Sequence, residues 1–99
     1  MSGLQITTEN GGDLRRVIAV GEVDLATAEQ FRAAIAESAG STVVVDLAGV
    51  SFMDSSGIVA LETARRQIEA EGHRLEIRDA QRAVRRVFEI LGIEDWLTE

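Results

Sequence analysis

The chain has 99 residues, a net charge of −7 and no cysteine, and all ten of its basic residues are arginine. This length suits one domain built on one core, so we expect residues 1–99 to form a single domain. The lack of cysteine excludes disulfides and thiolate metal sites, the lack of lysine excludes a P-loop and Schiff-base chemistry, and the acidic balance opposes direct binding to nucleic acids or anionic membranes.

The first quarter of the chain predicts a β-hairpin. Apolar and polar residues alternate from Leu4 to Thr8, residues 15–23 form a more apolar strand, and Asn10–Asp13 between them is a turn sequence. The second strand ends at Gly21–Asp24, where the chain has to change direction. We therefore expect two antiparallel strands followed by a reversal.

A helix and a buried strand come next. Thr27 and Gln30 stand three residues apart, as in a capping box, and apolar residues recur at helical spacing from there up to Gly40, which predicts a helix over this range. Val43–Val45 is an unbroken β-branched run, which is typical of a central strand covered on both faces.

The second half of the chain predicts a helix, a strand, a helix and a last turn. The second helix is expected over about residues 55–71, residues 74–78 suit a strand near a sheet edge, and Asp79 is placed to cap a third helix that ends at Gly92. Residues 93–97 should fold back onto the core, because they carry three large apolar groups. This order predicts an α/β fold with a small, mixed, mostly parallel sheet of about four strands, packed with three main helices and a short C-terminal turn.

Polar residues follow two strands of this predicted sheet. Asp24 ends the second strand, and Asp54, Ser55 and Ser56 stand between the central strand and the second helix. The carboxyl ends of parallel strands gather at one edge of a sheet, where α/β domains usually hold their ligands. Each aspartate taken alone would be interpreted as a helix cap, but their coincidence with two serines predicts a functional edge.

These residues do not build an enzyme. A nucleophile elbow needs G-x-S-x-G, which the sequence around Ser55 lacks, and the only histidine, His73, lies at the far end of the second helix, roughly 25 Å away. A metal site would need Asp24, Asp46 and Asp54 to converge without any cysteine or nearby histidine. We expect no catalytic residue, no cofactor and no metal.

The segment Val43–Leu61 (VVVDLAGVSFMDSSGIVAL) resembles the phosphoacceptor segment of the STAS domain family, as found in bacterial anti-sigma factor antagonists. Gly21–Asp24 (GEVD) is similar to the family's Gly-Glu-Leu-Asp at the end of the second strand, and the order of elements agrees with a STAS-like fold. Asp54–Gly57 (DSSG) is the specific signal. The sequence departs from the family pattern at Val59, where the family usually has glycine.

The resemblance implies a transcription regulator that works by partner switching. Ser55 would be phosphorylated by the anti-sigma factor, a serine kinase that uses Mg-ATP, and only the unphosphorylated form would bind this kinase and free the sigma factor. A serine phosphatase would restore that form. The implied partner-binding residues are Asp24, Asp54, Ser56, Gly57 and Ile58.

Two other interpretations remain open. A STAS adaptor that is not phosphorylated would hold another protein, such as the ATPase of a lipid-transport complex, through the second helix. If the chain bound RNA or DNA, Arg82, Arg85 and Arg86 of the third helix would form a basic patch together with Arg74 and Arg78, although a solvated face is the default interpretation.

The sequence also gives an expected location. Residues 1–12 lack a basic segment followed by an apolar run, and no apolar stretch approaches the roughly 20 residues of a membrane helix. We expect a soluble cytoplasmic protein.

Overall fold

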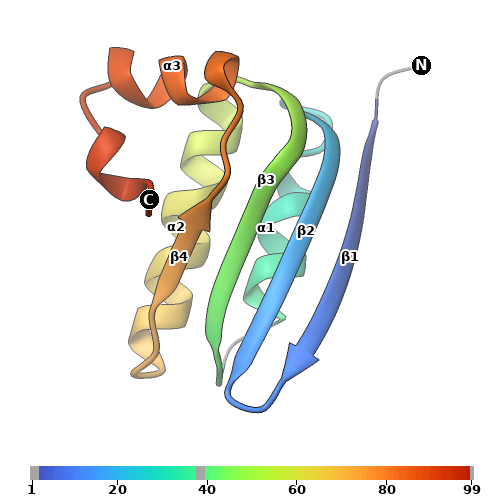
Figure 1. Ribbon diagram of the computed structural model, residues 1–99, viewed down its shortest axis with the longest axis vertical. Helices are drawn as coiled ribbons and strands as arrows, with labels where there is room; N and C mark the ends of the chain where they lie inside the picture. Colours follow the sequence, from blue (N-terminus) through green and yellow to red (C-terminus); the bar gives the residue numbers. More distant parts are fainter. Residues whose placement is uncertain (1–2, 38–39, 99) are drawn as a thin grey trace.

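The computed structural model describes residues 3–37 and 40–98. This part of the chain forms strands, helices and one 3₁₀ turn around a single sheet (Figure 1). In chain order the elements are β1 (Leu4–Gly11), β2 (Leu14–Val23), α1 (Ala28–Ala36), β3 (Thr42–Met53), α2 (Ser55–Ala70), β4 (Leu75–Arg78), α3 (Arg82–Ile90) and η1 (Glu94–Trp96).

The sheet has the strand order β1-β2-β3-β4. β1 and β2 pair antiparallel as a hairpin, whereas β2 with β3 and β3 with β4 pair in parallel. This confirms the predicted small, mostly parallel sheet with a short strand at its edge. The register places Val23 beside Met53, the last residues of β2 and β3. The segments that follow these two strands therefore leave the sheet at the same edge.

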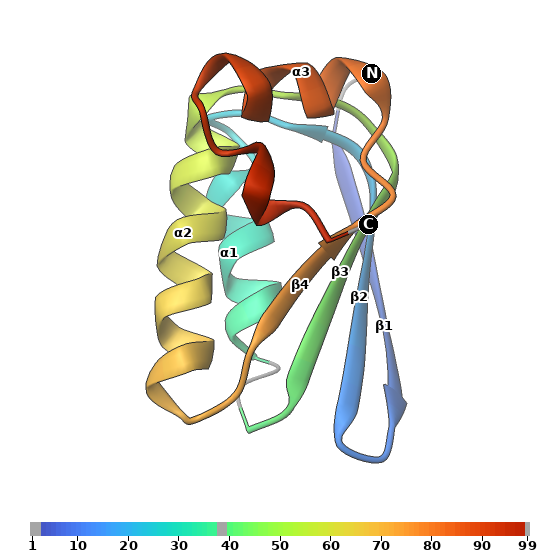
Figure 2. The same ribbon diagram turned by 60° about the vertical axis from the view of Figure 1, so that its left-hand side comes forward.

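Helices α1 and α2 lie side by side on one face of the sheet (Figures 1 and 2). Their apolar stripes pack against alternate residues of β2 and β3, as the helical and strand periodicities require. Side chains with no exposed surface between these two layers are Val17, Ala19, Phe31, Ile35, Val43, Val45, Leu47, Ala64 and Ile68.

The opposite face of the sheet is here called the open face, and the prediction that the central strand is covered on both faces was wrong. Within the described residues no helix covers it (Figure 2), so Val43–Val45 is not enclosed on both faces. Val44 points to this face and is half-buried. The register sets Val44 between Arg16 of β2 and Glu76 of β4, whose long side chains can shield an apolar neighbour with their aliphatic stems.

Helix α3 lies across the end of the sheet at which α2 begins (Figures 1 and 2). Its N-cap is Gln81, whose side-chain amide donates to the backbone carbonyl of Ala48 at 2.7 Å. The prediction that Asp79 caps this helix was wrong. Asp79 has a φ of 62°, so it forms the left-handed turn that leads into the helix instead.

The C-terminal turn packs back onto the domain, as predicted. Phe88 of α3 is fully buried, and Trp96 of η1 meets it edge to face with ring centroids 6.3 Å apart. Leu97 forms an isolated parallel bridge with Ile77 of β4 and exposes only 7% of its surface. The last described residues thereby cover the outer edge of the sheet.

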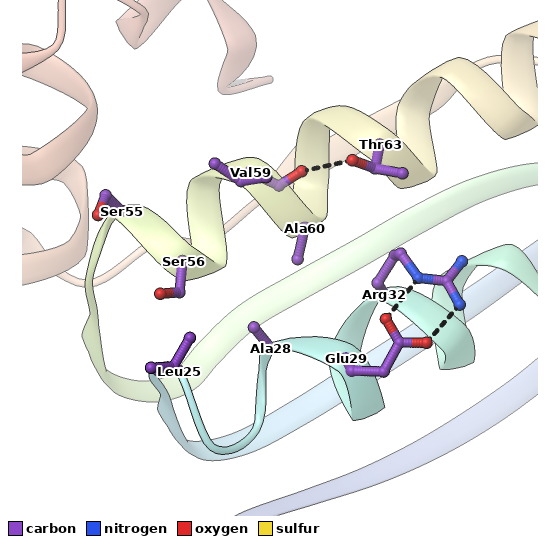
Figure 3. A pocket seen from close by; sticks show the side chains of 9 residues that line it. All are labelled: Leu25, Ala28, Glu29, Arg32, Ser55, Ser56, Val59, Ala60 and Thr63. Atoms are coloured by element: carbon purple, nitrogen blue, oxygen red, sulfur yellow. Dashed lines mark hydrogen bonds and ion pairs between the residues drawn. The ribbon is translucent and has the colours of Figure 1, made fainter.

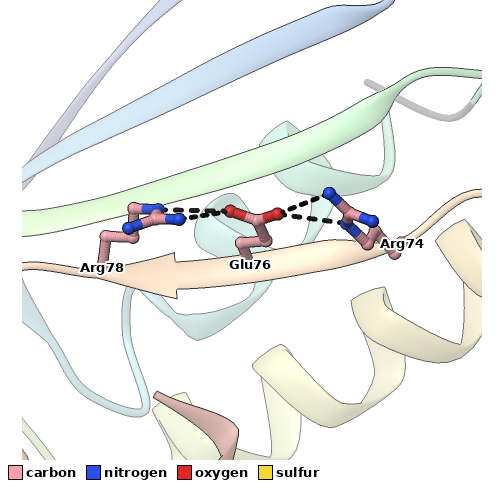
Figure 4. A network of polar contacts seen from close by, with 3 residues as sticks. All are labelled: Arg74, Glu76 and Arg78. Atoms are coloured by element: carbon pink, nitrogen blue, oxygen red, sulfur yellow. Dashed lines mark hydrogen bonds and ion pairs between the residues drawn. The ribbon is translucent and has the colours of Figure 1, made fainter. Parts of the chain in front are cut away.

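The open face carries a three-residue ion network along β4 (Figure 4). Arg78 donates to one oxygen of Glu76 from Nη2 at 2.9 Å and from Nε at 3.1 Å, and Arg74 donates to the other oxygen at 3.0 Å. The hydrogen bonds from Arg78 lower the pKa of Glu76 most, burial of the carboxylate opposes them, and Arg74 lowers this pKa further.

The Glu76→Gln variant should lose about 1 kcal/mol of unfolding free energy at pH 7, because it removes the shared anion while both arginines remain partly in water. A carboxylate with a lowered folded-state pKa contributes stability above its unfolded pKa of about 4.3 and loses it as the pH falls through the folded value. The difference in unfolding free energy between wild type and Glu76→Gln should therefore be smaller at pH 3 than at pH 7. Urea unfolding of both proteins at the two pH values measures this difference.

Glu62→Gln is the matched control. Among the described residues, Glu62 forms an ion pair only with Arg66, at 3.3 Å on the outer surface of α2, and this exposed pair should contribute little at either pH. A Glu76→Gln penalty that is the same at pH 7 and pH 3 would contradict the assignment to charge.

Candidate functional site

The site is an edge of the sheet at which two aspartates meet. Asp24 directly follows Val23 and Asp54 directly follows Met53, the residues that the parallel register places side by side. The backbone N–H of Asp54 donates to the carbonyl of Val23 at 3.2 Å, which ties the two strand ends together. The predicted convergence of the two strand ends is therefore present, and Asp46 is absent from it.

Asp54 is the N-cap of α2. Its extended backbone lets the carboxylate Oδ1 accept the N–H of Ser56 at 2.9 Å, and its carbonyl accepts the N–H of Gly57 at 3.0 Å. Ser55 follows the cap as the first helical residue and is exposed. None of the described residues holds the Ser55 hydroxyl in a hydrogen bond, so this hydroxyl faces solvent at the start of the helix.

Asp24 holds the loop between β2 and α1. Its Oδ1 accepts the N–H groups of Ala26 at 3.0 Å and Thr27 at 3.2 Å, and its own N–H donates to Thr27 Oγ1 at 3.0 Å. The Thr27 hydroxyl donates to the carbonyl of Glu22 at 2.9 Å. These contacts fix the loop that stands beside the Ser55 turn.

The predicted capping box at Thr27 and Gln30 was wrong. Thr27 is the N-cap of α1 by position, but its side chain makes no cap hydrogen bond. The amide of Gln30 instead donates to the carbonyl of Leu4 at 2.9 Å, and so ties α1 to the edge strand. The Asp24 carboxylate binds N–H groups of the loop before α1, and the Asp24 backbone carbonyl accepts the N–H of Ala28, the first helical residue, at 2.8 Å.

Gly57 and Ile58, two of the predicted partner-binding residues, lie on the side of α2 that faces the core. Gly57 is buried against the sheet, and Ile58 exposes 7% of its surface within the core. Neither offers a side chain to a partner. The next residue, Val59, exposes 63%, and Ser56 is half-buried.

An apolar groove runs from Ser55 and Ser56 along the seam between α1 and α2 (Figure 3). Leu25, from the loop before α1, is the residue that sequence analysis missed, and it exposes 83% of its surface. The only signal for it in the sequence is a large apolar side chain inside a polar turn. The residues that line the groove are Leu25, Ala28, Glu29, Arg32, Ser55, Ser56, Val59, Ala60 and Thr63.

Asp46 lies away from this edge, on the open face. It accepts hydrogen bonds from Arg16 and from the N–H of Ala48. Burial acts to raise the pKa of Asp46, but these hydrogen bonds and the charge of Arg16 outweigh it and hold the pKa below its usual value. Asp46 is thus a structural anion.

The model of the STAS domain family matches residues 6–98. The chain belongs to the STAS domain family. The observed sheet, helices and C-terminal turn agree with this assignment, and the DSSG turn of this STAS domain lies at the start of α2, where the resemblance placed it.

Relatives with anti-sigma factor antagonist names are similar to this STAS domain. The anti-sigma F factor antagonist of Lysinibacillus sphaericus is 34% identical over 83 residues, which cover 80% of this chain and 71% of the relative. The structure of the anti-sigma factor antagonist SpoIIAA in its unphosphorylated form aligns with a TM-score of 0.81 and 27% identity, covering 95% of this chain and 86% of SpoIIAA.

SpoIIAA from Bacillus has also been solved in its phosphorylated form. That structure aligns with a TM-score of 0.71 and 26% identity, and covers 95% of this chain and 89% of its own. In residues 3–37 and 40–98 of the STAS domain, no helix combines the length and apolar character needed to cross a bilayer.

Proposed function

We propose that this STAS domain is an anti-sigma factor antagonist and that Ser55 is its phosphoacceptor. In this proposal the unphosphorylated form binds an anti-sigma factor serine kinase and releases the sigma factor, and phosphorylation ends that binding. The observation that carries the proposal is the free, exposed Ser55 hydroxyl directly after the Asp54 cap. The similarity to SpoIIAA, known in unphosphorylated and phosphorylated forms, supports it.

In the proposed reaction, the kinase transfers the γ-phosphoryl group of Mg-ATP to the Ser55 hydroxyl. The Ser55 oxygen forms a bond to the γ-phosphorus of Mg-ATP, the bond from that phosphorus to the bridging oxygen of ADP breaks, and the hydroxyl proton passes to a base of the kinase. The STAS domain is the substrate of this step. A serine phosphatase then hydrolyses the ester with water, which returns the Ser55 hydroxyl and releases inorganic phosphate.

The charges around Ser55 indicate that a phosphate on this residue would change partner binding without unfolding the domain. A phosphate adds about −1.5 to −2 charge at pH 7. The positive end of the α2 dipole would favour it by about 0.3–1 kcal/mol. The N–H groups of Ser56 and Gly57 are already bonded to Asp54, so they offer the phosphate little direct hydrogen bonding. Asp24 and Asp54 repel the new charge, and the surface that a partner meets changes strongly.

The test is phosphorylation of wild type, Ser55→Ala and Ser56→Ala by the anti-sigma factor kinase with Mg-ATP, mapped by mass spectrometry. We expect one phosphate on wild type and Ser56→Ala and none on Ser55→Ala. Binding of the kinase to the phosphorylated protein should weaken by about tenfold or more, which isothermal titration measures.

Ser56→Ala is the matched control, because both serines share the same helical turn, and Ser55 is exposed whereas Ser56 is half-buried. Phosphate on Ser56 alone would refute the assignment. A wild-type protein that binds its partner but takes up no phosphate would favour the adaptor function instead, and Ser55→Ala would then leave binding unchanged.

A further inference from the structure

The open face of the sheet carries a row of apolar side chains that no described helix covers (Figure 2). Because Val17 and Ala19 of β2 are fully buried beneath the helices, strand alternation turns the residues beside them to the open face, and the same alternation applies along β3. The apolar residues placed there are Leu14, Ile18 and Val20 of β2 and Val44 and Phe52 of β3. Leu14, Val20 and Phe52 expose 45%, 48% and 47% of their surface, which is typical of a protein contact surface when such side chains share one face.

The charged side chains of the open face nearly balance in sign. They are Arg16, Arg74 and Arg78 on the positive side and Glu9, Glu22, Asp46 and Glu76 on the negative side. Arg16 pairs with Asp46, and Glu76 pairs with both of the other arginines. The whole chain, by contrast, carries 17 acidic and 10 basic residues, so most of its excess negative charge lies away from this face.

The size of the open face suits a protein interface. The sheet has four strands, of which β2 has ten residues and β3 has twelve. A strand spacing of about 4.8 Å and a rise of about 3.3 Å per residue give a face of roughly 500 Å² in projection. Its side chains raise the accessible area above this value, toward the roughly 800 Å² that each partner buries in a stable interface.

We infer that the open face is an interface between two copies of this chain, packed sheet against sheet about a two-fold axis. The apolar row of one copy would lie on that of the other, with the two sheets about 10 Å apart. A face whose charges are already paired selects neither a basic nor an acidic partner, whereas a second copy matches it in size and polarity. Two chains of net charge −7 also repel each other least where their charges balance.

This inference goes beyond the proposed function and does not depend on it. Helix α2, which begins at Ser55, packs on the other face of the sheet (Figure 2). Two copies joined through their open faces therefore leave both Ser55 hydroxyls exposed. Ser55→Ala should dimerise like wild type.

Sedimentation equilibrium of the full chain from about 10 μM to about 1 mM tests the dimer. Wild type should show a monomer–dimer equilibrium in this range. Val20→Glu should weaken dimerisation about tenfold or more, because it sets a carboxylate of each copy against apolar side chains of the other. Dimerisation of wild type should strengthen in about 0.5 M salt, since salt screens the repulsion between two acidic chains and leaves the apolar contact in place.

Val59→Glu is the matched control, because it makes the same substitution on α2, at a side chain that is 63% exposed on the other side of the sheet. It should dimerise like wild type. Val20→Thr keeps the β-branched shape that suits a strand, so it decides the question if circular dichroism shows that Val20→Glu does not fold, and it should weaken dimerisation about threefold. Wild type that stays monomeric up to about 1 mM would overturn the inference, as would folded Val20 variants that dimerise as tightly as Val59→Glu.

Discussion

Replacing Phe88 by alanine should lower the free energy of unfolding by about 3–5 kcal/mol, the usual cost of truncating a fully buried phenylalanine. Phe88 has no exposed surface and is the ring against which Trp96 packs edge to face. Its loss leaves a cavity under α3 and removes the contact that docks η1. Urea denaturation followed by far-UV circular dichroism gives the free energy.

The same variant has a second readout, because Trp96 is the only tryptophan of the chain. Its fluorescence and near-UV signal should change even under native conditions, as its packing partner is gone. Ile90→Ala on the same helix is the control. Ile90 is 71% exposed, so its truncation should change stability by less than about 0.5 kcal/mol. Equal effects of the two substitutions would contradict the packing assigned to α3.

Much of the fold could be predicted because it follows from the spacing of apolar residues along the chain. The edge that holds the site could be predicted because it follows from the parallel direction of the strands. Apolar residues spaced for helices and strands gave the element order, and the order of elements required parallel pairing. Parallel strands bring their carboxyl ends to one edge. Asp24 and Asp54 therefore had to be close, and the register of Val23 with Met53 confirms it.

The wrong predictions concern local motifs that long-range contacts overrode. Thr27 and Gln30 have the spacing of a capping box, yet the Thr27 hydroxyl donates to the carbonyl of Glu22 and the Gln30 amide donates to the carbonyl of Leu4. The spacing of the two residues contains no signal for either contact. Asp79 is a good cap by residue type, but the chain passes through a left-handed turn there before α3 starts.

Surfaces made by packing were the hardest to predict. Val44 belongs to an apolar run, but whether a helix covers its face depends on where both crossovers place α1 and α2. Leu25 belongs to neither helix, and its groove exists only because these two helices pack side by side. The residues of such a groove share no spacing in the sequence, so no periodicity reveals them.

Replacing Gly57 by valine should lower the free energy of unfolding by about 3 kcal/mol, since overpacking a tight site costs about 1–3 kcal/mol and the valine adds more than one methyl group. A Cβ at this position would lie 2.6 Å from Met53 Cγ and 2.9 Å from Val23 Cγ1. Both neighbours are buried at the strand ends and have little room to move. Urea denaturation measures the loss, with Gly11→Val, where a Cβ meets nothing within 4 Å, as the control.

The Gly57 substitution also tests how the fold supports the site, because this glycine sits directly behind the turn that presents Ser55. We expect a side chain at residue 57 to push the first turn of α2 away from β2 and β3, which would strain the hydrogen bond from Ser56 to Asp54. Gly57→Ala is the sharper variant, since its gain in helix propensity of up to about 1 kcal/mol offsets part of the crowding and leaves a folded protein. In that variant the Ser56 amide should exchange with solvent faster, and Ser55 phosphorylation should slow. Unchanged exchange at Ser56 would mean that the strand ends yield instead, and that the close approach of α2 to the sheet does not set the position of Ser55.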